Sequence, residues 1–443
     1  MRKIGIIGAG HVGLVTGACF AKLGNKVICC DNDREKIEKI KNLIIPFYEP
    51  GLEEIVKEGI EKGLLSFTDS IYEVVENSEI IFIAVGTPPT EEGKADLSYV
   101  ENVTIEIAKA LTKIKEKNPQ KELYKLIVEK STVPVFTSEW VRKTLELLTP
   151  TGIEFDIAAN PEFLREGSAI NDFFHPDRII IGVESERGKK IFEEIYEPIN
   201  CPKIFTDIKS AELIKHASNS FLALKISYIN AIANICEKVG ADVEVVAEGM
   251  GLDRRIGKEF LKAGIGYGGS CLPKDVSAFI HICEEIGYSF NLLKEVQKIN
   301  QYQRQLIIKK AKDLLWNLKG KIIGIFGLSF KPNTDDIREA PSIEVINLLL
   351  KEKAILKCYD PKAIENMKKI YPDIFYSEDP YLVAKDCNLL VFLTDWECFK
   401  ELDFKKIKEL MQTPYIIDGR NFLNYKFLKS LGFVYRGIGR KID

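Results

Sequence analysis

Residues 3–31 read "KIGIIGAGHVGLVTGACFAKLGNKVICCD", and this stretch decides the fold of the first part of the chain. The run "KIGII" has the composition of a buried strand, and Gly8, Gly10 and Gly13 follow it as G-x-G-x-x-G. Helical spacing comes next, and a second apolar run, "KVICC", ends on Asp31. A strand, a glycine turn, a helix and a strand closing on a carboxylate are typical of a dinucleotide-binding βαβ unit.

The chemistry of this unit favours NAD as the cofactor. Gly8, Gly10 and Gly13 let a pyrophosphate approach the helix N-terminus, and Asp31 is placed to bind ribose hydroxyls. A carboxylate there repels the 2′-phosphate of NADP, whereas Arg34, three residues further on, is the one feature that favours NADP. His11 lies inside the turn and is interpreted as a loop residue rather than a catalyst.

The rest of the chain repeats and then changes this pattern. Strands are expected at "EIIFIAVGTPP", "YKLIVEKSTVP", "FDIAANPEF" and "DRIIIGV", and their alternation with helices predicts a parallel, doubly wound sheet. Residues 209–238 contain neither glycine nor proline and have the apolar spacing of one long helix. From residue 321 the strand–helix pattern returns with "KIIGIFGLSFKP".

The predicted fold class is therefore α/β, with two Rossmann-like doubly wound domains joined by a long central helix and a small all-helical domain. The expected boundaries are 1–205 for the NAD-binding domain, 206–315 for a central helical and dimerisation domain with a catalytic loop, and 316–443 for the second Rossmann-like domain.

Composition excludes several classes of function. A formal net charge of -3 gives no basic field for nucleic acid or an anionic membrane, and no apolar run is long enough to span a bilayer. The ten cysteines form no C-x-x-C pair and only four histidines accompany them, so no metal site is expected. Without a secretion signal, the thiols predict a cytoplasmic protein with reduced cysteines.

The segment "GIGYGGSCLPKD", residues 264–275, places a cysteine after four glycines. No strand precedes this segment, so it is not interpreted as a phosphate-binding turn like the one at residues 8–13. Pro273 suits the first turn of a following helix, which puts Cys271 just before a helix N-terminus with Lys274 close by; both features favour a thiolate. The alternative is a tight turn with an incidental buried cysteine.

Other polar residues also fall into suggestive patterns. Lys215 and Asn219 are four residues apart on the long helix, where both could donate to one oxyanion. "NPEFLREG" brings Glu162 and Glu166 together, and "EKST" brings Thr132 to a strand end. Taken separately, each pattern is most often structural.

Taken together, these segments resemble the UDP-glucose/GDP-mannose dehydrogenase family over the whole chain. The matching segments occur in the family's order: "GAGHVGL", "VGTPP", "EKSTVPV", "NPEFLREGSAI", "PDRIIIG", "ELIKHASNSFLALKIS", "DRRIGKEFLKAGIGYGGSCLPKD" and "GLSFKPNTDDIRE". The segment "GGSCLPKD" is the most discriminating of them.

The resemblance implies oxidation of the C6 alcohol of a UDP-sugar to a carboxylate, with two NAD molecules used per turnover. Cys271 would be the nucleophile, forming a thiohemiacetal and then a thioester. Lys215 and Asn219 would stabilise the oxyanion, and Asp275 would position water. Glu162 and Thr132 would act in thioester hydrolysis.

The resemblance also implies two sets of binding residues. The NAD set comprises Gly8, Gly10, His11, Val12, Gly13, Asp31, Lys36, Gly86, Thr87, Thr132, Glu166 and Arg338. The sugar-nucleotide set comprises Glu162, Phe163, Leu164, Arg165, Lys215, Asn219, Arg255, the loop from Phe260 to Gly268, Lys331 and Arg420. Arg255 would reach across the interface of a homodimer or higher homo-oligomer. The chain departs from the family at Phe136, where glycine is common, and at Ala231, where glutamate is common.

Three other functions stay open at this point. A sibling enzyme could apply the same chemistry to GDP-mannose or an N-acetylated UDP-sugar. A one-step hydroxyacid dehydrogenase would need neither the cysteine loop nor the third domain. A non-catalytic NAD sensor would not need Cys271, Lys215, Asn219 and Asp275 together.

Overall fold

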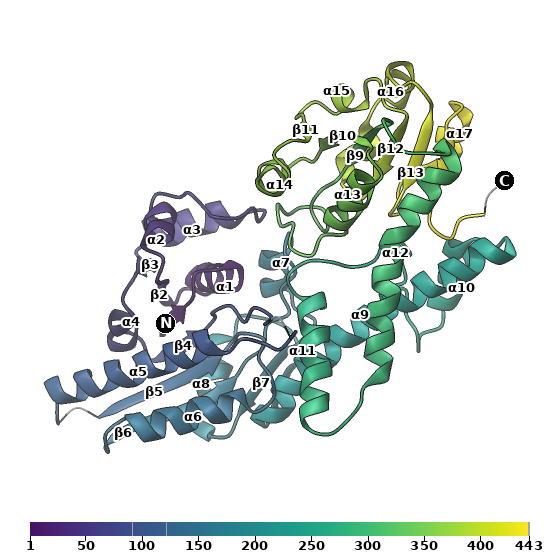
Figure 1. Ribbon diagram of the computed structural model, residues 1–443. Helices are drawn as coiled ribbons and strands as arrows, with labels where there is room; N and C mark the ends of the chain where they lie inside the picture. The colour runs from purple at the N-terminus through teal and green to yellow at the C-terminus, as the bar shows by residue number, and fades with distance from the viewer. Residues whose placement is uncertain (91, 121, 442–443) are drawn as a thin grey trace. The chain divides into compact units, whose positions relative to one another are not determined.

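The computed structural model describes residues 1–90, 92–120 and 122–441, which form two compact units (Figure 1). Unit 1 comprises Met1–Ser218 and Ser277–Ile286. Unit 2 comprises Asn219–Val276 and the chain from Gly287 onward. Within the described residues, no helix is both long and apolar enough to cross a membrane.

Unit 1 is built on an eight-stranded sheet with the order β3-β2-β1-β4-β5-β6-β7-β8. The strands are β1 (Lys3–Ile7), β2 (Lys26–Cys30), β3 (Leu65–Thr68), β4 (Ile80–Ile83), β5 (Leu123–Glu129), β6 (Ile153–Ala159), β7 (Ile179–Val183) and β8 (Lys203–Thr206). The six strands expected from the sequence are all present, and β3 and β8 add to them.

The prediction of a wholly parallel sheet is wrong at one pairing, because β7 runs antiparallel to β6. The connection between them contains only a loop and helix α7 (Ala169–Phe174). Six helical residues advance the chain by about 9 Å, whereas the seven residues of β6 advance it by about 23 Å. The helix alone does not carry the chain back along β6, and the chain enters β7 from the end at which it left β6.

Helices cover both faces of this sheet, as the doubly wound prediction requires. The remaining helices of unit 1 are α1 (His11–Lys22), α2 (Arg34–Lys41), α3 (Leu52–Glu61), α4 (Ile71–Asn77), α5 (Ser98–Lys117), α6 (Thr137–Leu148) and α8 (Glu186–Ile195). Because side chains alternate along a strand, Ile4 and Ile6 of β1 face the core under α1, whereas Ile7 faces the core under α5.

Two helices belong partly to each unit. Helix α9 (Ile208–Val239) begins in unit 1 and continues into unit 2, which confirms the long helix expected at 209–238. Helix α11 (Leu272–Glu285) begins in unit 2 and ends in unit 1. Pro273 lies in the first turn of α11, as expected, and Cys271 immediately precedes the helix.

Unit 2 contains a second sheet, in which all neighbouring strands are parallel, with the order β11-β10-β9-β12-β13-β14. Its strands are β9 (Ile322–Phe326), β10 (Ile355–Tyr359), β11 (Phe375–Tyr376), β12 (Leu389–Phe392), β13 (Tyr415–Asp418) and β14 (Val434–Arg436). Its helices are α10 (Val243–Gly251), α12 (Asn291–Leu315), α13 (Pro341–Lys351), α14 (Ile364–Ile370), α15 (Pro380–Ala384), η1 (Glu397–Glu401), α16 (Phe404–Leu410) and α17 (Tyr425–Ser430).

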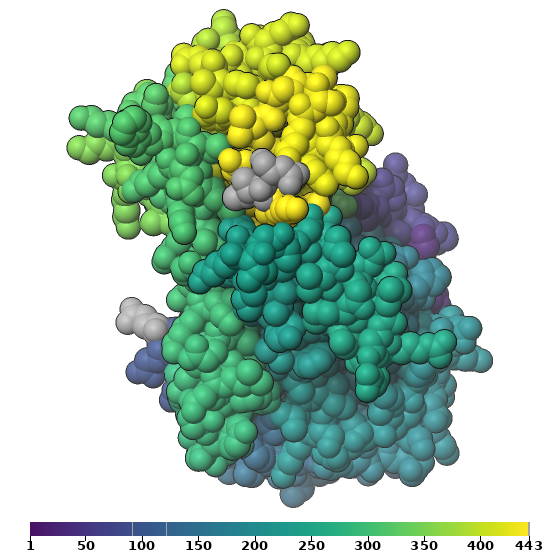
Figure 2. Space-filling model, turned by 90° about the vertical axis from the view of Figure 1, so that its right-hand side faces the viewer, coloured from purple at the N-terminus to yellow at the C-terminus, as the bar shows by residue number. Residues whose placement is uncertain are grey.

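The end of the described chain is attached to helix α10 within unit 2. Gly439 O accepts a hydrogen bond from Val243 N at 2.9 Å, and the Arg440 guanidinium pairs with Glu244 at 2.5 Å. Figure 2 shows this yellow segment lying against teal residues.

Candidate active site

Five strands of the first sheet end side by side and define one edge of unit 1. The register places in one row Ile7, Cys30, Ile83, Glu129 and Ala159. The glycine turn, Asp31, "VGTPP", "STVP" and "NPEF" all leave the sheet at this edge. The strand order reverses at β1, and such a switch point is where ligands bind in open α/β sheets.

The three glycines of the turn occupy different environments. Gly8 has φ +105°, which other residues rarely adopt. A Cβ on Gly13 would lie 1.8 Å from Gly8 O, so Gly13 is required for the helix to pack against the strand end. A Cβ on Gly10 would meet no protein atom within 4 Å. No contact within the protein requires glycine at position 10, whereas the close approach of a pyrophosphate would require it.

Asp31 is fixed beside this turn. Its Oδ2 accepts hydrogen bonds from Ala9 N at 2.9 Å and from Lys36 Nζ at 3.0 Å, and its side chain is 9 % exposed. Arg34 pairs with Asp69 at 2.6 Å instead of turning toward the carboxylate. Asp31 and Lys36 thus come together as expected, and the cation that favoured NADP is engaged elsewhere.

The loops after β4 and β5 are joined to each other. Thr87 Oγ1 donates a hydrogen bond to Thr132 O at 2.9 Å. A Cβ on Gly86, like one on Gly10, would meet no protein atom within 4 Å. These open positions at the switch point fit a dinucleotide, which Gly8, Gly10, Gly13, Asp31 and Gly86 would hold.

A buried ion pair lies near the same edge. Lys215 Nζ donates to Glu162 O at 2.6 Å and to Glu162 Oε1 at 3.1 Å, and both side chains are 5 % exposed. Glu162 Oε2 accepts a hydrogen bond from Leu164 N at 2.5 Å. Two cations lie near the Phe163 ring, with the Arg178 guanidinium 3.7 Å and Lys215 Nζ 5.0 Å from its centre. Glu162 and Lys215 were expected in the site, and unit 1 brings them into contact.

Two titratable residues of the same edge, Glu129 and Lys130, were not expected in the site. Burial lowers the pKa of Lys130 to about 8, and its Nζ donates to Asn160 Oδ1 at 3.0 Å. Burial raises the pKa of Glu129 to about 8. Two consecutive charged residues at the end of an apolar strand, in "VEKST", were the available signal.

Unit 2 holds the cysteine and two of the other expected catalytic residues. Asn219 Nδ2 donates to Asp275 Oδ2 at 2.6 Å, and Asp275 is buried. Asp275 N donates to Cys271 O at 2.8 Å, so Cys271 and Asp275 are one helical turn apart. Lys274, which was expected to support a thiolate, forms an ion pair through its Nζ with Asp275 Oδ1 at 2.7 Å.

Cys271 differs from most other cysteines of the chain in its exposure. All ten are free thiols, seven are buried, and Cys271 is partly exposed, with its Sγ 3.6 Å from Ser270 Oγ. Burial raises the pKa of the cysteines in the two cores, among them Cys29 and Cys358. Those thiols are inert structural groups, whereas Cys271 is accessible for chemistry.

The glycine-rich loop before Cys271 is packed against its own chain. A Cβ on Gly264 would lie 2.8 Å from Gly419 O, and one on Gly268 would lie 2.2 Å from Glu339 O. Gly266 and Gly269 have φ +90° and +85°, and their added Cβ atoms would meet Asn300 and Phe330. All four glycines are therefore accounted for by backbone conformation and close packing.

Arg420 fastens this loop to the second sheet. The guanidinium is buried, which lowers its pKa, and it donates to Gly266 O at 2.7 Å and to Leu393 O at 2.9 Å. Arg420 was expected in the sugar-nucleotide set, and here it fixes the loop that this set includes. Phe260, where the loop begins, has φ +62°.

The remaining expected residues lie in several separate places. Arg165 pairs with Asp172, Arg338 with Asp336, and Arg255 with Asp253. Lys331 Nζ lies 5.5 Å from the Phe330 ring centre. Val12 is in the first turn of α1.

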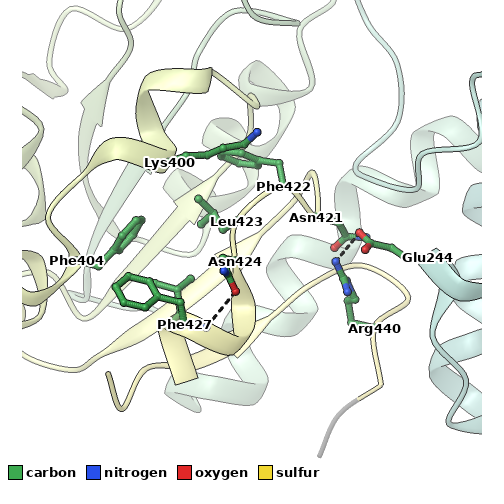
Figure 3. A pocket seen from close by; sticks show the side chains of 10 residues that line it. Glu244, Lys400, Phe404, Asn421, Phe422, Leu423, Asn424, Phe427 and Arg440 are labelled. Carbon is green, nitrogen blue, oxygen red and sulfur yellow. Dashed lines mark hydrogen bonds and ion pairs between the residues drawn. The ribbon is translucent and has the colours of Figure 1, made fainter. Parts of the chain in front are cut away.

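A cavity of about 360 Å³ lies in unit 2, and none of the residues expected in the site lines it (Figure 3). It is lined by Glu244, Lys400, Phe404, Asn421, Phe422, Leu423, Asn424, Phe427, Leu428 and Arg440. In the part of the chain that the structure describes, no group of three or more His, Cys, Asp or Glu side chains could hold a metal ion.

These features define a class of protein: a dinucleotide-dependent dehydrogenase with two Rossmann-like sheets and a cysteine at a helix N-terminus. Comparison of the sequence with protein families supports this class. The UDP-glucose/GDP-mannose dehydrogenase family matches with its NAD binding domain at residues 2–200, its central domain at 209–302 and its UDP binding domain at 324–425.

Individual relatives match along nearly their whole length. The chain is 46 % identical to UDP-glucose 6-dehydrogenase TuaD of Bacillus subtilis, covering 99 % of this chain and 94 % of the relative. It is 42 % identical to UDP-glucose 6-dehydrogenase of Rhizobium meliloti, covering 99 % of each. The chain belongs to the UDP-glucose/GDP-mannose dehydrogenase family and is an NAD-dependent nucleotide-sugar dehydrogenase.

Solved structures show the same fold. A UDP-glucose dehydrogenase from Pyrobaculum islandicum superposes with a TM-score of 0.91 at 37 % identity, covering 99 % of this chain and 98 % of that one. A UDP-D-ManNAc dehydrogenase from Pyrococcus horikoshii superposes with a TM-score of 0.85 at 27 % identity, covering 99 % of each chain.

Proposed function

We propose that this enzyme oxidises the C6 alcohol of UDP-glucose to the carboxylate of UDP-glucuronate in two steps. The observation that carries the proposal is Cys271, partly exposed before helix α11, with Asp275 one turn away and held by Asn219. UDP-glucose is favoured because the relatives named for it share 42 to 46 % identity, whereas the UDP-D-ManNAc enzyme shares 27 %.

The cysteine supplies the covalent step. After the alcohol becomes an aldehyde, the Cys271 thiolate adds to C6 to form a thiohemiacetal, whose oxidation leaves a thioester. The N-terminus of α11 favours the thiolate. Lys215 and Asn219, one turn apart on α9, donate to the C6 oxygen as it gains negative charge. When bound, NAD accepts one hydride in each oxidation, so two NAD molecules are used per sugar.

Hydrolysis of the thioester completes the reaction. Water adds to C6, the Cys271 sulfur leaves as a thiolate, and the proton of water passes to a carboxylate. Asp275 positions this water, and Glu162 and Thr132 assist. The support is that Asp275 and Glu162 are both buried and held by amide or ammonium donors, which fixes their orientation.

Binding is divided between the two Rossmann-like regions. NAD is held by the turn from Gly8 to Gly13, together with Asp31, Lys36 and the loops after β4 and β5, and also by Glu166 and Arg338. Lys331 and Arg420 lie in the matched UDP binding domain and serve the sugar nucleotide. The corresponding domains are 1–205, 206–315 and 316–443. The free thiols suit the cytoplasm.

The enzyme is further proposed to be at least a homodimer. Phe221, Tyr228 and Ile235 recur every seven residues on α9, and each is about half exposed, which leaves an apolar stripe on this helix. The Arg255 side chain is 89 % exposed, and it would reach a partner's substrate by exchanging its surface ion pair with Asp253 for that contact. Mixing Arg255→Ala and Cys271→Ala chains should restore activity, since one site per mixed dimer has both residues. No recovery despite subunit exchange would refute the cross-subunit role.

The substrate is tested with a panel of sugar nucleotides. UDP-glucose, GDP-mannose and two N-acetylated UDP-sugars are each assayed with NAD, and UDP-glucose is also assayed with NADP. The highest kcat/KM is expected for UDP-glucose with NAD. A higher value for GDP-mannose or an N-acetylated sugar would assign the enzyme to a sibling activity, and no turnover of any sugar would support the non-catalytic sensor.

A further inference from the structure

Glu49 is a buried carboxylate that joins three segments of unit 1. It lies in the loop between α2 and α3, and its side chain is fully buried. Its Oε2 accepts a hydrogen bond from Gly167 N at 2.7 Å and lies 2.7 Å from His11 Nε2, and its Oε1 accepts one from Ala169 N at 2.9 Å. Because a carboxylate can only accept, His11 Nε2 is the donor.

Two of the three segments carry ligand-binding residues. His11 is the first residue of α1, directly after Gly10 of the dinucleotide turn. Gly167 and Ala169 follow the loop 162–166, which carries Glu162 and Glu166. Phe47 packs on His11 with ring centres 5.0 Å apart. Burying a carboxylate costs free energy unless its oxygens accept hydrogen bonds. The hydrogen bonds to Glu49 therefore fix the positions of the three segments relative to one another.

We propose that Glu49 is a positioning residue that holds the dinucleotide turn, through His11, in a fixed relation to the loop 162–166, through the main chain at Gly167 and Ala169. The inference rests on the NAD site of the proposed function. Loss of the carboxylate should therefore weaken NAD binding and also impair use of the sugar nucleotide, whereas loss of the His11 donor alone should affect NAD.

The test measures the Kd of NAD alone by calorimetry and the KM of UDP-glucose in steady state. Glu49→Gln is expected to raise both constants about tenfold, as for loss of a charged hydrogen bond. His11→Leu should raise the Kd of NAD to a similar extent and leave the KM of UDP-glucose within about twofold. His11→Gln can still donate to Glu49 and should retain most of the affinity for NAD.

The double variant isolates the contact between the two side chains. If Glu49 acts on the turn through His11, the variant with both Glu49→Gln and His11→Leu binds NAD no more weakly than Glu49→Gln alone. Additive losses would overturn the proposal.

Asp360→Asn is the control for loss of a buried carboxylate outside unit 1. Asp360 is also buried and also accepts from two main-chain donors, Leu328 N and Ser329 N, but it lies in unit 2. It should lower Tm as Glu49→Gln does and leave the Kd of NAD unchanged. An equal loss of NAD affinity in Asp360→Asn, or none in Glu49→Gln, would contradict the proposal. Calorimetry with NAD alone tests the effect of Glu49 on NAD affinity even if the enzyme oxidises no sugar. If Glu49→Gln does not fold, the Kd of NAD for His11→Leu tests the same contact from its other side.

Discussion

The chain contains two glycine-rich segments, and they use glycine for different reasons. In the dinucleotide turn, Gly10 has open space where a Cβ would stand. In the loop before Cys271, a Cβ on Gly268 would lie 2.2 Å from Glu339 O, and Gly266 and Gly269 have positive φ. The first segment leaves room for a ligand at Gly10, whereas the second is filled by its own chain at all four glycines.

A glycine-rich sequence can therefore indicate either contact with a ligand or close packing of the chain against itself. The family resemblance assigns the loop from Phe260 to Gly268, which precedes Cys271, to the sugar nucleotide. The packing of all four glycines against protein atoms gives them a structural role, which is to bring the loop to the start of α11. Glycine density alone therefore does not indicate ligand contact; at Gly10 the indication is open space in the turn between a strand end and a helix N-terminus.

The largest effect is expected at Gly268. Gly268→Ala forces a Cβ against Glu339 O, so it should lower the free energy of unfolding by roughly 3 kcal/mol. Chemical denaturation measures this change. Gly249→Ala is the control, because it lies in α10 of the same unit with nothing near its Cβ position, and it should be neutral or slightly stabilising. Equal stabilities for the two variants would remove the packing explanation.

Gly10→Ala should leave protein stability nearly unchanged and weaken NAD binding. With no protein atom within 4 Å of the new Cβ and φ at −76°, stability should change by less than about 0.5 kcal/mol. The methyl group would occupy the space assigned to the pyrophosphate, so the Kd of NAD should rise roughly tenfold to a hundredfold. Unchanged NAD affinity, with Gly249→Ala as reference, would show that the open space is not the cofactor's.

The two regions also differ in how they bury charge. Arg420 at the glycine loop donates to several carbonyls, whereas Glu129 Oε2 at the edge behind the dinucleotide turn has no hydrogen-bond partner among the described residues. The raised pKa of Glu129, about 8, means that the folded protein binds a proton that the unfolded chain releases near pH 4.5. This contribution to stability is complete below pH 4.5 and is lost as the pH rises through 8.

Glu129→Gln removes that pH dependence. The variant should be close to the parent at pH 5 and exceed its free energy of unfolding by a few kcal/mol at pH 9. Lys130, whose lowered pKa acts in the opposite direction, is present in both proteins, so their difference isolates Glu129. A difference that does not vary with pH would show that Glu129 is not protonated in the folded state.

The smallest effect is expected at Phe136, where the family commonly has glycine. Phe136 has φ +81° and ψ −4°, a left-handed conformation that glycine adopts without strain. Phe136→Gly should stabilise the protein by about 0.5 kcal/mol, because relief of this strain exceeds the added entropy of the unfolded chain. Thermal unfolding should show a small rise in Tm, and a fall would mean that the exposed ring contributes more than the strain costs.

The sequence predicted most of the fold because its signals are local. Strand β1, the glycine turn and α1 follow from residues within one short stretch, and α9 follows from a long stretch without glycine or proline. The antiparallel β7 could not be predicted in this way, because its direction depends on the path of the whole connection between β6 and β7, which has no local sequence signal. Glu49 was missed for a similar reason: its partners His11 and Gly167 are 38 and 118 residues away in sequence.

The most direct test of the account counts NADH formed per UDP-glucose by the intact enzyme and by Cys271→Ala. The intact enzyme should form two NADH per sugar and release acid without free aldehyde. Cys271→Ala keeps the dinucleotide turn and the Lys215 and Asn219 donors, so it should interconvert alcohol and aldehyde slowly and form almost no acid. Near-normal acid formation by Cys271→Ala, with two NADH per sugar, would contradict the account and leave the cysteine loop without a chemical role.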